Sequence, residues 1–363
     1  MSTIALIVLA APLAAAPTSS SDLVKLGEGL VARGDGKKAQ LHLEKALADP
    51  ALSAADKAKA EQALGLAFLQ QKKGKEAVAH LEAATTLAPK SEKGWLYLGL
   101  AKDEFGDAAG SIAAYQKGTE NVPVSTSLKH ELGMALLSAG RNTEGAEVLQ
   151  KAASKAEHDP ELWADAAYAL SLVGRFKEAR EFAQRAVEMS PESPDALYTL
   201  GMAEAGLGNA KAAKSAFAEA IDSDELHVPA LFQLGVLLQA ENDDKRASAK
   251  LTQVLKVEPD HARAKAALAV SLLRLNPGDV RTEQLLKDAV AAEPKLASAW
   301  ANLGDVLARK GKIAEAKKAL SQAVKLAPTP SWQARLDEVA VVKEGTPSLP
   351  GAAAAAAVPA AKK

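Results

Sequence analysis

The spacing of apolar residues between Trp300 and Pro328 predicts two short helices joined by a tight turn. Apolar and small residues follow helical spacing on both sides of Gly311; they are Trp300, Leu303, Gly304 and Leu307 before it, and Ala316, Leu320 and Ala323 after it. A helical hairpin of this size cannot bury its apolar face alone. It therefore needs neighbouring hairpins, and the rest of the chain supplies them by repetition.

A small residue recurs along the chain with a period of 34 residues. It is Gly65, Gly99, Gly133, Ala167, Gly201, Gly235 and Ala269 in successive units. Gly27 lies 38 residues before Gly65, and Gly304 lies 35 residues after Ala269, so two units carry short insertions. The count predicts nine helical hairpins in tandem.

The motif inside these units resembles the tetratricopeptide repeat (TPR), a 34-residue helix-turn-helix with W-x2-L-G, a later A-x3-F/L and a terminal proline. Three units show it well: Trp95, Leu98 and Gly99 with Tyr115 and Pro123; Trp163 with Gly174, Ala179, Ala186 and Pro191; and Leu64, Gly65 and Phe68 with Ala77, Leu81, Ala84 and Pro89. The resemblance implies an all-α fold, a right-handed α-solenoid superhelix of helical hairpins with a C-terminal capping helix.

We expect the chain to divide into four parts. Residues 1–19 are a leader, 20–330 are the repeats, 331–344 are a capping helix and 345–363 are a disordered Ala/Pro tail. The nine repeats span 20–53, 58–91, 92–125, 126–159, 160–193, 194–227, 228–261, 262–296 and 297–330. Thr329 is expected to cap the last helix and Pro330 to occupy its first turn.

Three recurrent residue types have a physical role in each hairpin. The small residue at the eighth position is expected where the first helix crosses the second, because a larger side chain would force the axes apart. Glycine is expected to end the first helix in a left-handed conformation at Gly34, Gly106, Gly140, Gly174, Gly208 and Gly311. Proline is expected to end the second helix at Pro89, Pro123, Pro191, Pro259, Pro294 and Pro328.

Composition removes several classes of function from consideration. The 44 basic and 45 acidic residues are interspersed, so no basic stripe marks a nucleic-acid partner. The chain has no cysteine, which excludes disulfides and thiolate chemistry. Its six histidines are scattered over separate repeats without metal-ligand spacing, and no cofactor motif is complete. Because the repeats use nearly the whole chain, we expect no enzymatic activity, no metal and no cofactor.

The candidate functional residues lie on the first helices of the middle repeats. In proteins that the chain resembles, positions 2, 5, 9, 12 and 13 line the concave side of the superhelix. Here these positions hold an apolar set in repeats 3 to 7: Leu96, Leu100, Met134, Leu137, Tyr168, Tyr198, Met202, Phe232 and Val236, with Val270 continuing it in repeat 8. An apolar stripe of this kind is a candidate binding surface for an extended or helical segment of a protein partner.

The apolar set has an alternative interpretation, in which these side chains pack against neighbouring first helices and only thicken the core. The end repeats place polar residues at the same positions, namely Ser21, Glu28, Asp305 and Arg309, which favours a binding role for the middle. The lysine and asparagine clamp with which some relatives hold a carboxy-terminal carboxylate is missing, so a chaperone-tail adaptor is disfavoured.

Residues 1–16 form an uncharged apolar run with small residues at Ala14 and Ala16, which is typical of a secretory signal. The run is shorter than the roughly 20 apolar residues that span a bilayer, so no transmembrane segment is expected in the mature chain. No Lys or Arg precedes it, and Pro17 is unusual after a cleavage site. We expect a periplasmic or secreted protein, with a cytoplasmic protein as the alternative.

The leading hypothesis is a non-catalytic scaffold that supports assembly of a bacterial cell-envelope complex, such as one for secretion, pilus formation, motility or polysaccharide export. A cytosolic assembly or regulatory adaptor and a periplasmic carrier of a lipid or glycan remain open as alternatives. A hydrolase or transferase is opposed by the lack of a convergent His, Asp and Ser set.

Overall fold

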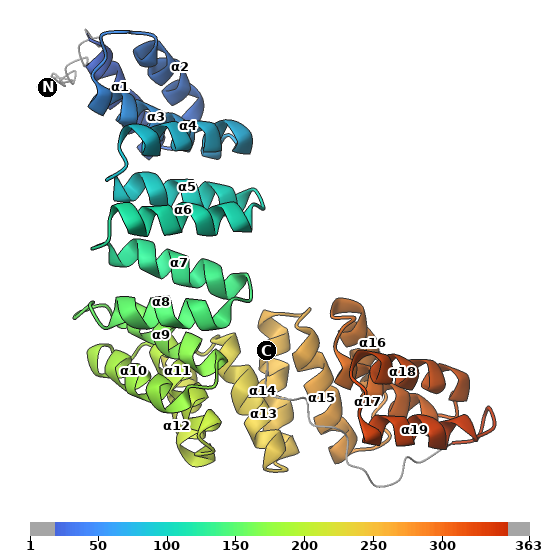
Figure 1. Cartoon of the computed structure of the whole chain (residues 1–363). Coiled ribbons are helices and arrows are strands. Elements are labelled where there is room, and N and C mark those ends of the chain that lie inside the picture. Colours follow the sequence, from blue (N-terminus) through green and yellow to red (C-terminus); the bar gives the residue numbers. More distant parts are fainter. Residues whose placement is uncertain (1–18, 348–363) are drawn as a thin grey trace, which may run out of the picture. The chain divides into compact units, whose positions relative to one another are not determined.

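The computed structural model describes residues 19–347, and all regular structure in them is α-helical. Of the nineteen helices in these residues, the first eighteen pack as nine successive antiparallel pairs and the last packs on the end, which confirms the all-α solenoid (Figure 1). The leader and most of the Ala/Pro tail, residues 1–18 and 348–363, lie outside the described residues. Within residues 19–347, no helix has the length and apolar character that crossing a membrane requires.

The chain forms two compact units, and the first ends at Glu157. This unit contains four helical hairpins, each made of two neighbouring helices that are antiparallel (Figure 1). Its helices are α1 (Ser20–Ala32), α2 (Gly36–Leu47), α3 (Ala54–Gln70), α4 (Gly74–Leu87), α5 (Glu92–Glu104), α6 (Ala108–Asn121), α7 (Thr126–Ser138) and α8 (Asn142–Ala153). Each first helix also packs on the second helix of the hairpin before it, so buried side chains form a layer along the stack.

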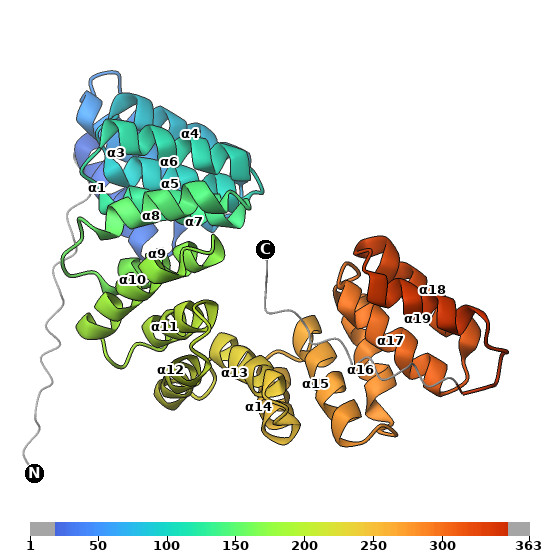
Figure 2. The same cartoon turned by 60° about the horizontal axis from the view of Figure 1, so that its bottom comes forward.

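The second unit starts at His158 and contains five hairpins and a final helix (Figure 2). Its helices are α9 (Pro160–Leu172), α10 (Phe176–Met189), α11 (Pro194–Gly206), α12 (Ala210–Ser223), α13 (Val228–Ala240), α14 (Asp244–Val257), α15 (Ala262–Leu275), α16 (Arg281–Ala292), α17 (Ala297–Arg309), α18 (Ile313–Leu326) and α19 (Pro330–Ala340). One large cluster of buried leucine, alanine, valine and phenylalanine side chains runs from α11 to α19.

Eight of the nine hairpins have a left-handed residue in the turn between their two helices, and the turn of repeat 8 has none. The six predicted glycines all have positive φ, between 72° and 82°. In repeats 2 and 7 the same place is taken by Lys72 (φ 58°) and Asn242 (φ 62°). Lysine carries a Cβ that crowds the backbone in this conformation, so the turn at Lys72 holds a strained residue for the sake of the hairpin geometry.

The eighth position lies at the predicted crossing of the two helices. A Cβ built on Gly99 would stand 2.3 Å from the ring of Tyr115, and one on Gly201 would stand 2.5 Å from the ring of Phe217. These distances are well inside van der Waals contact, so the glycines allow the large side chain of the second helix to fill the crossing.

The two insertions are absorbed at different places in a hairpin. The four extra residues before repeat 2 form one more helical turn, because α3 begins at Ala54 rather than at the repeat boundary. The extra residue of repeat 8 lies in the turn between α15 and α16, which runs from Asn276 to Val280. The core positions of both repeats therefore stay in register.

The C-terminal cap is a helix followed by a short return of the chain. The Thr329 side chain accepts a hydrogen bond from the Trp332 amide at 3.3 Å, and Pro330 starts α19, as predicted. Beyond the helix, both Glu344 carboxylate oxygens accept hydrogen bonds from the first amides of α18, at Ile313 (3.1 Å) and Ala314 (2.7 Å). Glu344 thus supplies the cap that the N-cap residue of α18 lacks.

Candidate partner-binding surface

The nine candidate residues lie on first helices, divided between the two units. Leu96, Leu100, Met134 and Leu137 belong to α5 and α7 of the first unit. Tyr168, Tyr198, Met202, Phe232 and Val236 belong to α9, α11 and α13 of the second unit. Seven of the nine are half-buried, Leu100 is exposed and Phe232 is buried. We refer to the two groups as the α5/α7 surface and the α9/α11/α13 surface.

The α5/α7 surface is built on packed side chains. Leu96 lies against the core cluster of the first unit, and a Cβ built on Gly145 of α8 would meet Leu137 at 2.8 Å. Leu137 therefore covers the glycine of its own hairpin partner as well as facing outward. Leu100 is 51% exposed, the most of the four, and it is the residue of this surface that has most area left for a partner.

Tyr198 makes two ring contacts within the α9/α11/α13 surface. Its ring lies 6.0 Å from that of Phe217 and 5.5 Å from that of His227, measured between centroids. Burial, together with the nearby Tyr168 phenol, raises the pKa of Tyr198 above its usual range, while a hydrogen bond with Gln233 acts in the opposite direction. The phenol stays neutral at physiological pH and keeps its hydroxyl proton for hydrogen bonding.

Two histidines that the sequence motifs do not single out contact aromatic rings of this surface. The Nδ1 atoms of His227 and His261 accept hydrogen bonds from the amides of Ala230 (3.2 Å) and Ala264 (3.1 Å), so these histidines cap α13 and α15. The ring of His261 lies 5.0 Å from that of Phe232, which repeats the contact between His227 and Tyr198. Their spacing of one repeat length was the sequence signal for a shared structural role.

The structure gives some candidate positions a packing role instead. Phe232 is 9% exposed and belongs to the core cluster, and Val270 is 0% exposed. Asp305, interpreted above as a polar end of the groove, is 7% exposed and forms a buried ion pair with Arg335 of α19. That interpretation of Asp305 is wrong, since the capping helix occupies its carboxylate.

The remaining four residues of the α9/α11/α13 surface keep part of their area accessible. Tyr168, Met202 and Val236 are half-buried like Tyr198, and Met202, Val236 and Tyr198 rest on the core cluster. The Asp195 carboxylate, whose side chain is 81% exposed, acts on Tyr198 and contacts the His227 ring at 3.2 Å, and Glu161 is a second exposed carboxylate on α9. The surface therefore offers apolar contact area with neighbouring acidic groups.

No group of three or more His, Cys, Asp or Glu side chains in residues 19–347 is arranged to hold a metal ion. The polar groups of the α9/α11/α13 surface are hydroxyl, amide and carboxylate groups suited to hydrogen bonding. The arrangement as described can therefore bind through apolar contact and hydrogen bonds.

Comparison with known proteins places these features in a family. Models of the tetratricopeptide repeat match residues 24–92, 63–126, 96–160, 136–203, 194–225 and 297–330. No curated protein matches the chain.

Three solved structures are similar in fold. The chain is similar to one chain of the crystal structure of the APC/C hetero-tetramer Cut9-Hcn1, with 13% identity, a TM-score of 0.60, and coverage of 89% of this chain and 64% of that one. It is similar to the C-terminal part of a TPR repeat-containing protein from Cytophaga hutchinsonii, with 16% identity, a TM-score of 0.51, and coverage of 68% and 99%. A third is YrrB, described as a TPR protein with an unusual peptide-binding site, with 20% identity, a TM-score of 0.45, and coverage of 52% and 95%.

The repeated hairpins, their crossing glycines and the family-model matches along both units agree. The chain belongs to the tetratricopeptide repeat family.

Proposed function

We propose that this protein is a non-catalytic scaffold that holds a segment of a partner protein against the first helices of its middle repeats. The TPR repeats support a protein–protein interaction scaffold in general. The observation that carries the finer proposal is the α9/α11/α13 surface, where Tyr168, Tyr198, Met202 and Val236 remain half-buried at matching positions of successive repeats. Water contacts these apolar groups in the free protein, and a partner would remove it.

The side chains of this surface suit a segment that binds in an extended or helical form. Met202 is unbranched and adapts to the shape of a partner side chain. Tyr168 and Tyr198 add large contact area with few rotatable bonds, and their hydroxyls can bond to peptide groups. The exposed Asp195 and Glu161 favour a partner segment with a basic residue beside its apolar ones.

Site-specific photo-crosslinking in the native cell tests the proposal. A photoreactive residue is placed at Leu100, Tyr168 or Met202, with Lys318, exposed on the second helix α18, as the control position. The expected result is the same partner crosslinked from the three first-helix positions and not from position 318. Equal crosslinking at position 318, or none at the three positions in the folded protein, would contradict it.

The double change Tyr168→Ser and Tyr198→Ser is less clean as a test, because the Tyr198 ring packs on Phe217 and His227. The single changes Leu100→Ser and Met202→Ser remove apolar contact area from accessible positions and disturb less of the core. They should weaken capture of the crosslinked partner while leaving the melting temperature nearly unchanged.

We further propose export to a bacterial periplasm, where the scaffold would serve a cell-envelope complex. The support is the apolar composition of residues 1–16 with small residues at Ala14 and Ala16. Amino-terminal analysis of the protein recovered from periplasmic and cytoplasmic fractions tests it. A mature chain that starts close to Pro17 in the periplasmic fraction is expected, and an intact Met1 in the cytoplasmic fraction would favour the cytosolic adaptor.

A further inference from the structure

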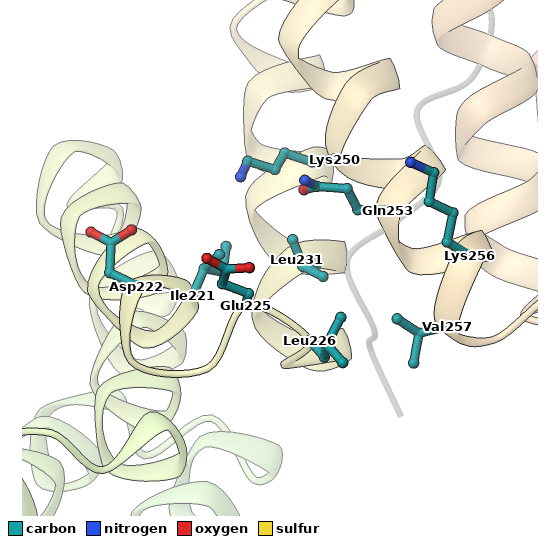
Figure 3. A pocket seen from close by; sticks show the side chains of 9 residues that line it. All are labelled: Ile221, Asp222, Glu225, Leu226, Leu231, Lys250, Gln253, Lys256 and Val257. Carbon is teal, nitrogen blue, oxygen red and sulfur yellow. The ribbon is translucent and has the colours of Figure 1, made fainter.

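A hollow lies between the C-terminal end of α12 and the helix α14, away from the α5/α7 and α9/α11/α13 surfaces. Figure 3 shows it from close by, and its cavity volume is about 470 Å³. Its apolar lining comes from Ile221 at the end of α12, Leu226 in the following loop, Leu231 in α13 and Val257 at the end of α14. A volume of this size accommodates one or two side chains of a bound peptide.

Two of the four apolar residues that line the hollow are accessible, while Ile221 and Leu231 are buried. Leu226 is 65% exposed and Val257 is 40% exposed. Leu226 follows Glu225, which stands where six other repeats end their second helix with proline, and most of those repeats place a polar residue after it. Repeat 6 therefore departs from its neighbours by presenting a leucine to solvent at the edge of the hollow.

Charged side chains stand on opposite walls of the hollow. Figure 3 shows the carboxylates of Asp222 and Glu225 on the α12 side, and Lys250 and Lys256 on the α14 side. Within the described residues, none of these four side chains forms an ion pair or a hydrogen bond with another side chain. Each wall is thus free to pair with an opposite charge on a bound molecule.

A comparable hollow in the first unit shows a different arrangement. It lies between α4 and α6, and there Lys102 and Glu82 pair with each other at 2.8 Å. In that hollow the lysine and the carboxylate neutralise each other, whereas the charged side chains of the α12/α14 hollow are not paired with each other. The separation of the two signs across an apolar floor is therefore a property of the α12/α14 hollow and does not follow from the repeat alone.

We propose that the α12/α14 hollow binds a short linear segment of another protein in which an apolar side chain is flanked by a basic residue on one side and an acidic residue on the other. The apolar side chain rests on Leu226 and Val257, which are exposed, above the buried Leu231. The basic residue faces Asp222 and Glu225, and the acidic residue faces Lys250 and Lys256. Because second helices form most of this site, the protein would hold two partner segments on different faces of the second unit.

Blocked peptides that carry both charges in either order test this proposal on the full chain. The probes are acetyl-Lys-Ala-Leu-Ala-Glu-amide, acetyl-Glu-Ala-Leu-Ala-Lys-amide, and the first sequence with serine in place of leucine. Methyl NMR of labelled protein reports binding through Ile221, Leu226, Leu231 and Val257. We expect saturable shifts of these methyls with one leucine peptide, weaker binding of the reversed order, and no saturation with the serine peptide.

Charge exchange makes the test specific. The double variant Lys250→Glu with Lys256→Glu should bind the preferred peptide about tenfold more weakly. Adding Asp222→Lys and Glu225→Lys exchanges the walls, and the variant should then prefer the opposite peptide order. The matched control, Lys318→Glu with Lys325→Glu on exposed positions of α18, should keep the wild-type preference.

Three results would overturn the proposal. These are saturable binding of the serine peptide at the same methyls, a peptide order preference that survives exchange of the walls, and self-association of the protein in sedimentation that the Lys250 and Lys256 changes abolish. The last result would mean that a second copy of this chain occupies the hollow. Binding at the first-helix surfaces is measured separately by the Met202→Ser variant, which should leave peptide binding at the hollow unchanged.

Discussion

At the scale of single residues, the eighth position of each repeat is matched to the side chain that it faces across the helix crossing. Glycine stands opposite the bulky Tyr115 and Phe217. In repeat 5 the position holds Ala167, and the corresponding residue of the second helix is Ala183; both are buried. The combined volume of the two facing side chains is thus limited by the distance between the helix axes at the crossing.

Gly201→Ala should therefore lower the stability of the second unit. The new Cβ would stand 2.5 Å from the Phe217 ring, so the ring or the helix must move, and overpacking of this kind costs about 1–3 kcal/mol. Urea unfolding followed by circular dichroism measures the change. In a Phe217→Ala background the cost of Gly201→Ala should shrink, and an unchanged cost would show that the crossing does not limit residue size.

Lys72→Gly should raise stability. The residue has φ 58°, a conformation that costs a non-glycine residue about 1–2 kcal/mol, and glycine adopts it freely. Asn242→Gly should gain less, because asparagine tolerates this region better. The control Ala79→Gly, at an exposed position in the middle of α4, should lose about 1 kcal/mol. A lower melting temperature for Lys72→Gly would contradict the strain at this turn.

Residue periodicity predicts what depends on local spacing and fails where a distant segment decides. It finds the left-handed turn glycines and the crossing positions, because both recur at fixed places in each hairpin. It does not find that Asp305 is buried, because its partner Arg335 lies in the capping helix thirty residues later. It also does not separate the buried Phe232 from the accessible Tyr168, since both fall on the same helical stripe.

At the scale of helices, charged contacts tie the last hairpins together. Glu283 of α16 pairs with Lys287 of its own helix and with Lys310 and Lys312 of the turn between α17 and α18, at 2.7–2.9 Å. Hydrogen bonds from the three lysines, with Lys310 first, lower the pKa of Glu283 from 4.5 to about 2. The carboxylate therefore links repeats 8 and 9 only while it is ionised.

Glu283→Gln should destabilise the second unit by about 1–2 kcal/mol near neutral pH, after allowance for solvent around the partly exposed lysines. Because the folded pKa lies below the unfolded value, this contribution is complete above pH 4.5 and is lost as the pH falls towards 2. The free energies of unfolding of wild type and variant, measured across that pH range, should become equal at low pH. A difference that stays constant with pH would rule out the ionised link.

The buried pair of Asp305 and Arg335 fixes α19 on the end of the array. Burial lowers the pKa of Arg335, while the charge of Glu338 acts in the opposite direction, and the guanidinium contacts the Asp305 carboxylate directly. Asp305→Asn should cost about 3–5 kcal/mol, because it leaves a buried cation without its partner. The double change Asp305→Leu with Arg335→Met should recover most of this loss in thermal unfolding. Equal losses in the single and double variants would mean that the pair is not the cause.

At the scale of the whole molecule, the packing positions that recur in each repeat hold the stack together, and the remaining first-helix positions differ in chemistry from repeat to repeat. Repeat arrays gain stability from each neighbouring contact, so surface residues between those contacts can change without loss of the fold. The α5/α7 surface, the α9/α11/α13 surface and the α12/α14 hollow are such places. The family predicts the fold in detail, whereas the choice of partner is a property of a site and not of the fold.

In the proposed function, the accessible first-helix residues of the middle repeats bind a protein segment. Calorimetric titration of the segment identified by crosslinking measures the affinity of this binding for wild type, Leu100→Ser, Met202→Ser and the control Val341→Ser, at an 86% exposed position. We predict at least an approximately tenfold loss of affinity, about 1.4 kcal/mol, for one or both first-helix variants and no change for the control. Unchanged affinity for both variants, with their melting temperatures intact, would contradict the claim.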